Sequence, residues 1–200
     1  MNRGAGILLS ITSLPSKYGI GCFSKSAYDF VDWLKAAGQT YWQILPLVPP
    51  GGGNSPYMSA SSFAGNPFFL DLDALSEDGL LTPEELRSAT CPSPDRVDYP
   101  WLHSTRPPLL RAAWQRGRER YRSELEAFCT AEADWLPDYA LFMALRSHFD
   151  GKELRDWPIS IRRRDPEALA PLRQVLADEV EYQCFLQMLF YRQWTALKEY

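Results

Sequence analysis

The 200-residue sequence lacks an excess of basic residues, because 21 Lys and Arg stand against 25 Asp and Glu, for a net charge of −4. A nucleic-acid-binding surface needs clustered positive charge, so we expect no nucleic-acid partner. No stretch reaches the roughly eighteen consecutive apolar residues that span a membrane, and the apolar run in MNRGAGILLSI is too short for a secretory signal. We therefore expect a cytoplasmic protein without a membrane partner.

Cysteine and histidine are scarce and scattered. The sequence has no CxxC pair, and no histidine stands at metal-ligand spacing from a cysteine or from the other histidine. This spacing argues against a zinc site and favours free thiols in a reducing compartment. The residues concerned are Cys22, Cys91, Cys129, Cys184, His103 and His148.

Apolar residues are plentiful, at 46% of the chain, which is enough for one sizeable core. Aromatic residues reach 14%, with seven Trp and ten Tyr. Most of these rings belong in a core, but their surplus favours an aromatic-lined ligand site.

The first part of the chain alternates apolar runs with loops. Residues 6–11 and 41–47 are typical of buried strands. Between them, the apolar spacing after Ser24 predicts a helix to about Ala37, followed by Gly38 at the position that favours glycine. A strand–helix–strand unit implies parallel strands joined by a right-handed crossover.

A third short strand is expected at Pro67–Leu72, after which the pattern becomes helical. The capping box Thr82–Glu85 predicts a helix start, and residues 89–108 are Pro-rich and typical of irregular structure. Further helices are expected over residues 108–130, 135–149, 165–176 and 178–199. The last carries apolar residues nearly all round, which predicts burial on most sides. The chain stops inside this pattern, which favours the front part of a larger protein.

The stretch GGGNSPYMSASSFAGN at residues 51–66 is either a flexible linker or one wall of a site. It carries an aromatic ring, several hydroxyls and two asparagines between apolar runs. In strand–helix–strand units the ligand-facing loops follow the carboxyl ends of the strands. The loops at 12–22 and 48–66 both follow a strand, so we expect them at the ligand-binding edge.

Five short motifs occur in order near the amino terminus: GILLSITSLP at 6–15, YGIG at 18–21, WQILPL at 42–47, NSPY at 54–57 and SFAGNP at 62–67. Together with FLQ at 185–187 and QW at 193–194, they resemble the amino-terminal part of the 4-α-glucanotransferases (amylomaltase or disproportionating enzyme). The resemblance spans essentially the whole chain, and the order of the motifs makes it specific.

The resemblance implies an α/β fold, a (β/α)8 TIM barrel with a helical insertion, of which this chain holds only the first strands and the insertion. It divides the chain into the first βα units (1–75), a mainly helical insertion (76–177) and a helix returning to the barrel (178–200).

The implied activity is transfer of α-1,4-glucan segments between maltooligosaccharides with retention, which uses carboxyls about 5–5.5 Å apart. In the family these carboxylates lie beyond the position matching Tyr200, so no catalytic residue is assigned here. Neither a metal nor another cofactor is implied for this step.

The resemblance also implies that the Ser-Pro-Tyr loop reaches the donor sugar, so Ser55 and Tyr57 are candidate substrate-binding residues. The physical case is independent, because a tyrosine ring can pack on the apolar face of a sugar and hydroxyls can bond its rim. Asn66 is a third candidate, although a side chain that satisfies loop backbone is the favoured interpretation there.

For several other residues, we weigh a structural role against a functional one. Trp42 is expected in the core, while Ser13 fits a pocket and a turn equally well. Asp71 and Asp73 are typical of a solvated strand edge more than of a catalytic pair. The glycines of Gly51–Gly53 stand where some relatives carry a tyrosine that stacks on glucan, which argues against that secondary sugar platform here.

Two alternatives stay open beside the transferase. A non-catalytic carbohydrate-binding or structural fragment would keep the loop without the chemistry, and a hydrolase of the same clan would pass the sugar to water. If the gene continues past residue 200 into strands that carry three carboxylates, the protein is an enzyme and the non-catalytic fragment is excluded. Residues 1–200 alone are expected to fold poorly, because strand edges and apolar surface would stay exposed.

Overall fold

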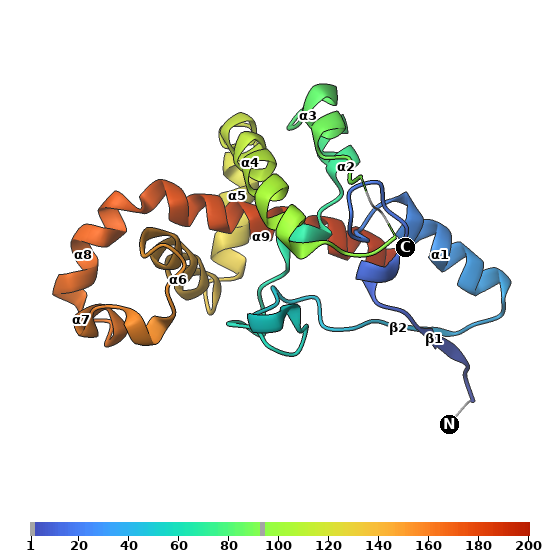
Figure 1. The fold of residues 1–200 in the computed structure, drawn as a ribbon, viewed down its shortest axis with the longest axis horizontal. Coiled ribbons are helices and arrows are strands. Elements are labelled where there is room, and N and C mark those ends of the chain that lie inside the picture. Colours follow the sequence, from blue (N-terminus) through green and yellow to red (C-terminus); the bar gives the residue numbers. More distant parts are fainter. Residues whose placement is uncertain (1–2, 93–94) are drawn as a thin grey trace. The chain divides into compact units, whose positions relative to one another are not determined.

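Two short parallel strands stand at the start of the computed structural model, which describes residues 3–92 and 95–200. β1 (Gly6–Leu8) pairs with β2 (Tyr41–Gln43) so that Ile7 lies opposite Trp42, and α1 (Lys25–Ala36) connects the strands (Figure 1). The predicted strand–helix–strand unit is therefore confirmed.

Both strands are shorter than the expected ranges 6–11 and 41–47. The ladder ends where the Leu9 amide donates to the Gln43 carbonyl at 3.0 Å. Directly afterwards the Ser10 side chain accepts from the Thr12 amide and starts the 3-10 helix Ile11–Ser13. The first strand thus turns away early, and the backbone after Gln43 has no neighbouring strand within the described part of the chain.

Both ends of α1 lie close to the positions that the sequence predicts. Ser24 is the N-cap, and Gly38 takes a positive φ of 68° just after the helix, where its amide donates to the Lys35 carbonyl. Glycine adopts this left-handed conformation without steric cost. The Phe30 ring lies 4.9 Å from the Trp42 ring, so α1 packs on β2; Trp42 is half-buried rather than a fully enclosed core residue.

The prediction of a strand at Pro67–Leu72 is wrong. Residues Pro67–Phe69 form a 3-10 helix, and α2 (Leu72–Glu77) begins directly afterwards. Two side chains cause the change, since Asn66 accepts from the Phe68 amide and Asp71 accepts from the Asp73 amide. Such caps favour helix over strand.

The capping box at Thr82 is confirmed. The Thr82 hydroxyl accepts from the Glu85 amide at 3.2 Å, and the Glu85 carboxylate accepts from the Thr82 amide at 2.7 Å, at the start of α3 (Pro83–Ser88). Two of the free amides at the helix start are thereby satisfied.

The prediction of irregular structure over residues 89–108 is wrong from residue 99 onward, because α4 (Tyr99–Gly117) begins there. Residues 93 and 94 of this stretch lie outside the described residues. The Asp98 side chain caps α4 by accepting from the Trp101 amide at 3.0 Å. Prolines inside a helix remove hydrogen bonds, but the helix continues through Pro107–Pro108, where its apolar face is buried.

The chain divides into two compact units. Unit 1 comprises residues 1–119 and 189–200, and unit 2 comprises residues 120–188. The boundary expected after residue 75 falls inside α2, and that after residue 177 falls at the start of the last helix. The three-part division at 1–75, 76–177 and 178–200 concerns the whole enzyme and stays a prediction.

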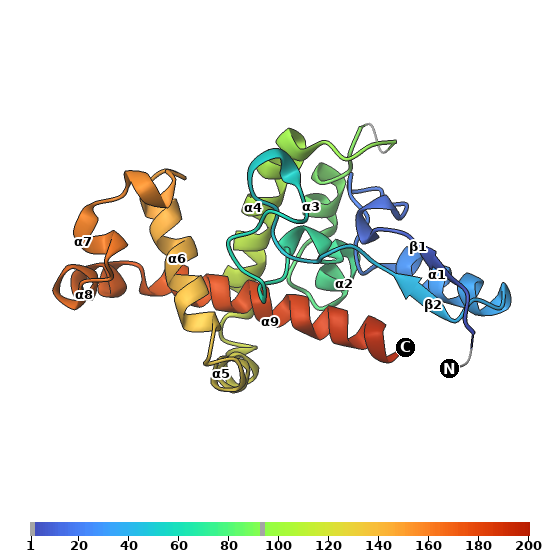
Figure 2. The same ribbon diagram turned by 90° about the horizontal axis from the view of Figure 1, so that it is seen from below.

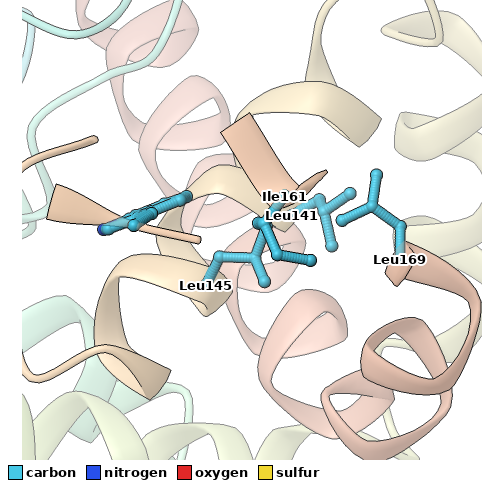
Figure 3. Packing of buried hydrophobic residues seen from close by; sticks show 5 residues of the cluster. Leu141, Leu145, Ile161 and Leu169 are labelled. Atoms are coloured by element: carbon cyan, nitrogen blue, oxygen red, sulfur yellow. The ribbon is translucent and has the colours of Figure 1, made fainter. Parts of the chain in front are cut away.

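Unit 2 is helical, as expected, and α9 extends beyond it into unit 1. Its helices are α5 (Arg122–Ala131), α6 (Leu136–His148), α7 (Ile159–Arg162), α8 (Pro166–Val175) and the first half of α9 (Ala177–Glu199), with a 3-10 helix at Leu154–Asp156. Side chains of α6, α7 and α8, together with Trp157 just after the 3-10 helix, meet in an apolar cluster (Figure 3). It is formed by Leu141, Leu145, Trp157, Ile161 and Leu169.

The middle of α9 is buried all round from Tyr182 to Phe190, in agreement with its apolar pattern. All four cysteines are free thiols, as expected from their spacing. None of the helices in residues 3–92 and 95–200 combines the length and the apolar composition that a membrane-spanning helix needs.

Candidate functional site

The glycine-rich stretch after β2 is a closed turn. The Gly51 amide donates to the Met58 carbonyl at 2.5 Å, and the Met58 amide donates to the Ser55 carbonyl at 3.1 Å. Within it, the 3-10 helix Gly52–Asn54 has positive φ angles of 71° at Gly53 and 56° at Asn54. Hydrogen bonds thus tie residues 51 and 58 together, which a simple spacer would not require.

The turn presents Tyr57 to solvent. Its side chain is 74% exposed, while Ser55 is half-buried and its hydroxyl accepts from the Tyr57 amide at 3.3 Å. Pro56 fixes the backbone between them. The tyrosine is therefore held on a turn of defined conformation and is largely exposed to solvent.

Asn66 occupies a different environment. It is only 4% exposed, its amide nitrogen donates to the Leu47 carbonyl at 2.8 Å, and its side-chain oxygen accepts from the Phe68 amide at 3.0 Å. This bonding matches the structural interpretation of Asn66. It also fixes the distal end of the loop against the chain after β2.

A cavity of about 120 Å³ brings parts of this loop together with the end of β1. Asn66, Asn54 and Pro56 line it from the loop, Ser10 and Thr12 from the segment after β1, and Tyr99 from the start of α4. Neither Ser55 nor Tyr57 lines this cavity. Of the three candidates, Asn66 is therefore enclosed and lines the cavity, whereas Tyr57 is exposed to solvent. Ser55 is half-buried and lies outside the cavity lining.

The sequence does not indicate Tyr99 as a lining residue, because the Pro-rich composition of residues 89–108 is typical of irregular structure. The pattern Asp98-Tyr99-Pro100, with a capping carboxylate and a proline in the first turn, is a helix-start signal that could have located it.

The second half of the loop is held by the C-terminal half of α9. The Tyr191 hydroxyl donates to the Phe63 carbonyl at 2.7 Å. Ser61 supports the same segment by accepting from the Phe63 and Ala64 amides at 3.1 and 3.0 Å. The loop is thus fixed at several points along its length.

Asp71 and Asp73 are not on a strand edge, which corrects that expectation. They face a wide polar pocket of about 1140 Å³, where Asp73 accepts from the Tyr18 hydroxyl at 2.6 Å and pairs with Lys17 at 3.0 Å. Asp71 caps α2 and is 9% exposed; burial raises its pKa to about 6. Burial likewise raises the pKa of the neighbouring Cys22 thiol, to about 11.

Arg106 lies buried behind this pocket. One guanidinium nitrogen donates to the Tyr18 carbonyl at 3.4 Å, and the guanidinium stands 5.7 Å from the centre of the Tyr18 ring. Its Nε and Nη1 atoms have no hydrogen-bond partner among the residues that the structure describes. Burial lowers the Arg106 pKa, and nearby Asp71 opposes that change. The contacts of Asp73 with Tyr18 and Lys17 hold the 12–22 loop against α2, and Arg106 joins the same loop to α4. We assign none of these groups a catalytic role.

Within residues 3–92 and 95–200, no three side chains of the His, Cys, Asp and Glu types form a group that could hold a metal ion.

Comparison with known proteins places these features in a family. Residues 9–200 match the 4-alpha-glucanotransferase family. The chain is 44% identical over 200 residues to the 4-alpha-glucanotransferase of Thermus thermophilus, covering 98% of this chain and 39% of that protein. It is 38% identical over 208 residues to the chloroplastic/amyloplastic 4-alpha-glucanotransferase of Solanum tuberosum, covering 99% of this chain and 36% of the relative.

A solved structure agrees. The amylomaltase from Streptococcus agalactiae in complex with acarbose superimposes with a TM-score of 0.94 at 40% identity, covering 99% of this chain and 41% of that one. The chain thus spans about two fifths of the length of these proteins. With nearly all of its residues matched, the chain belongs to the 4-alpha-glucanotransferase family.

Proposed function

We propose that the protein containing this chain transfers α-1,4-glucan segments from one maltooligosaccharide to the 4-hydroxyl of another. The observation that carries the proposal is the likeness, at a TM-score of 0.94, to an amylomaltase in complex with acarbose. Acarbose is a ligand of that relative; for this chain, α-1,4-glucans are the proposed substrates.

In the proposed enzyme this chain supplies the front of a (β/α)8 barrel. β1 and β2 are its first two strands, and the loops after them lie at the edge where such barrels bind ligands. The catalytic carboxylates lie downstream of Tyr200. They act by retention, in which one carboxylate attacks the anomeric carbon and a second serves as acid and then as base.

The contribution of the loop at 48–66 is to hold the donor sugar. The exposed Tyr57 ring packs on the apolar face of a glucose unit, and the Ser55 hydroxyl bonds its rim. Asn66 acts from the cavity between β1 and the loop, where its side-chain amide could donate to a sugar hydroxyl. A cytoplasmic location and the absence of nucleic-acid and membrane partners stay predictions.

The test is a chromatographic product profile from maltotriose. The protein encoded by the full gene and the chain 1–200 are incubated separately with the substrate. Glucose together with longer maltodextrins, from the full protein only, supports transfer with downstream carboxylates. Glucose and maltose without longer products would make the protein a hydrolase, and products from chain 1–200 would place catalytic residues within it.

A further inference from the structure

A short segment between α6 and α8 reverses the charge of the chain. Residues 152–164 hold five basic and two acidic residues, whereas the whole chain carries a net charge of −4. The segment contains the 3-10 helix Leu154–Asp156 and α7, and it lies wholly within unit 2 (Figure 2). This excess of basic side chains creates a local positive potential that attracts anions.

The segment is fixed from its buried side. Trp157 and Ile161 are 5% and 7% exposed and belong to the apolar cluster of unit 2 (Figure 3). The Trp157 indole nitrogen donates to the Lys152 carbonyl at 3.0 Å, and the Arg162 guanidinium donates to the Arg155 carbonyl at 3.1 Å. These contacts hold the 3-10 helix and α7 together, so the exposed side chains of both are carried on a fixed backbone.

A pocket of about 400 Å³ opens on the exposed side of the segment. Its lining consists of Leu154, Arg155, Ile159, Arg162 and Arg163. Leu154 and Ile159 are 48% and 61% exposed, so both present apolar surface to a bound molecule. The pocket thus combines an apolar wall with three guanidinium groups, and its volume suits a small molecule.

Two of the three guanidinium groups have no acidic partner within residues 3–92 and 95–200. Arg155 pairs with Glu153 at 3.0 Å and lies 4.0 Å from Asp156, which offsets its charge. The Arg163 guanidinium bonds to no described residue, and that of Arg162 bonds only to the Arg155 carbonyl. Two uncompensated positive charges match a phosphate monoester, which carries a charge of about −1.5 to −2 and three strong acceptor oxygens.

We propose that this pocket binds a small phosphate monoester. Arg162 and Arg163 bind the phosphate through parallel hydrogen bonds of their guanidinium groups. The organic part packs on Leu154 and Ile159, and a sugar phosphate and a nucleotide both offer this combination of phosphate and partly apolar body. None of the lining residues also lines the cavity at Asn66, so the site does not depend on the proposed transferase activity.

The experiment is isothermal titration calorimetry of the full-length protein with glucose 1-phosphate, adenosine monophosphate and inorganic phosphate. At least one ester should bind more tightly than inorganic phosphate, because only an ester uses the apolar wall. The tighter ester identifies the organic part as a sugar or a nucleoside. The affinity should fall as the salt concentration rises, since the arginines are exposed. No binding of either ester at millimolar concentration, or inorganic phosphate binding as tightly as both, would overturn the proposal.

Three single variants locate the site. Arg163→Gln should weaken ester binding about tenfold, the equivalent of one charge-assisted hydrogen bond. Ile159→Ser should weaken ester binding and leave the affinity for inorganic phosphate unchanged. Arg146→Gln is the matched control, because it removes the same charge from an exposed residue of unit 2 outside the pocket. Native affinity in Arg163→Gln, or an equal loss in Arg146→Gln, would place the bound ester elsewhere and refute the assignment.

Discussion

A β-carbon added to Gly65 would lie 2.1 Å from Cδ1 of the Phe190 ring, so the end of the loop at 48–66 presses directly on α9. Contacts under 3.0 Å are essentially never found for real β-carbons. The loop of the proposed donor site is therefore positioned by a helix far downstream in the sequence. Phe190 also packs on Phe23, with ring centres 5.2 Å apart, which limits its freedom to move away.

Replacing Gly65 with alanine should destabilise the protein by about 1–3 kcal/mol, the range for overpacking a filled core. The added methyl group must displace the Phe190 ring or the loop backbone, because both are held by other contacts. Urea unfolding of the full protein measures the effect. Gly52→Ala is the matched control, since a β-carbon at Gly52 meets nothing within 4 Å. Equal stability of the two variants would contradict the prediction.

Tyr57→Ala should lower kcat/KM for maltotriose by an amount equivalent to about 1–3 kcal/mol, the scale of a lost aromatic contact. Because the side chain is 74% exposed, the free energy of unfolding should change by no more than about 0.5 kcal/mol. Tyr57→Phe keeps the ring and should retain most of the activity. Unchanged kinetics for the alanine variant would remove Tyr57 from the donor site.

The sequence predicts helix ends correctly where a single capping residue determines them. The Thr82 capping box and the cap at Gly38 are both present, because each depends on neighbours within four residues. The apolar run at 67–72 was misread because apolar content alone does not distinguish a strand from capped helical turns. The sequence does not indicate the first half of α4, because Pro107 and Pro108 usually end helices, and only tertiary burial offsets that cost.

The candidate site shows the same limit. The loop at 48–66 could be located from its position after a strand, and its tyrosine from the Ser-Pro-Tyr motif. The cavity, however, depends on Tyr99, and the anchoring depends on Phe190 and Tyr191. These residues are distant in sequence, so no local pattern indicates that they meet.

Asp71 should make stability depend on pH in a specific direction. Burial raises its folded-state pKa from 3.8 to about 6, so the folded protein keeps a proton that the unfolded chain releases between these values. The buried charge therefore costs stability above about pH 6, and this cost is relieved as the pH falls towards 4.

Asp71→Asn removes the charge and keeps the oxygen that caps α2. At pH 7 the variant should be more stable than the native protein by up to about 3 kcal/mol, at about 1.4 kcal/mol for each pKa unit. The difference should vanish near pH 4. Unfolding free energies measured at intervals between pH 4 and 7 give the comparison, and a variant less stable at pH 7 would refute it.

Glu85 should act in the opposite direction. Arg116 binds its carboxylate through both Nη atoms, at 2.8 and 2.9 Å, and this pairing holds the pKa of Glu85 at about 2, below its ordinary 4.5. A folded-state pKa below the unfolded value contributes stability that is present above about pH 4.5 and lost as the pH falls through 2. The side chains of Arg116 and Glu85 are 39% and 25% exposed, so solvent screening limits the contribution.

Glu85→Gln should therefore cost about 1 kcal/mol at pH 7, the upper range for a partly exposed pair. The glutamine can still accept from the Thr82 amide, so the change isolates the ion pair from the capping box. The neighbouring Glu84→Gln is the control, because Glu84 and its partner Arg87 are 80% and 68% exposed and such pairs add little. The Glu85 effect should shrink towards pH 2 and in high salt, since protonation and screening each remove the attraction. A cost that stays constant across pH and salt would mean that Glu85 stabilises α3 through packing instead of charge.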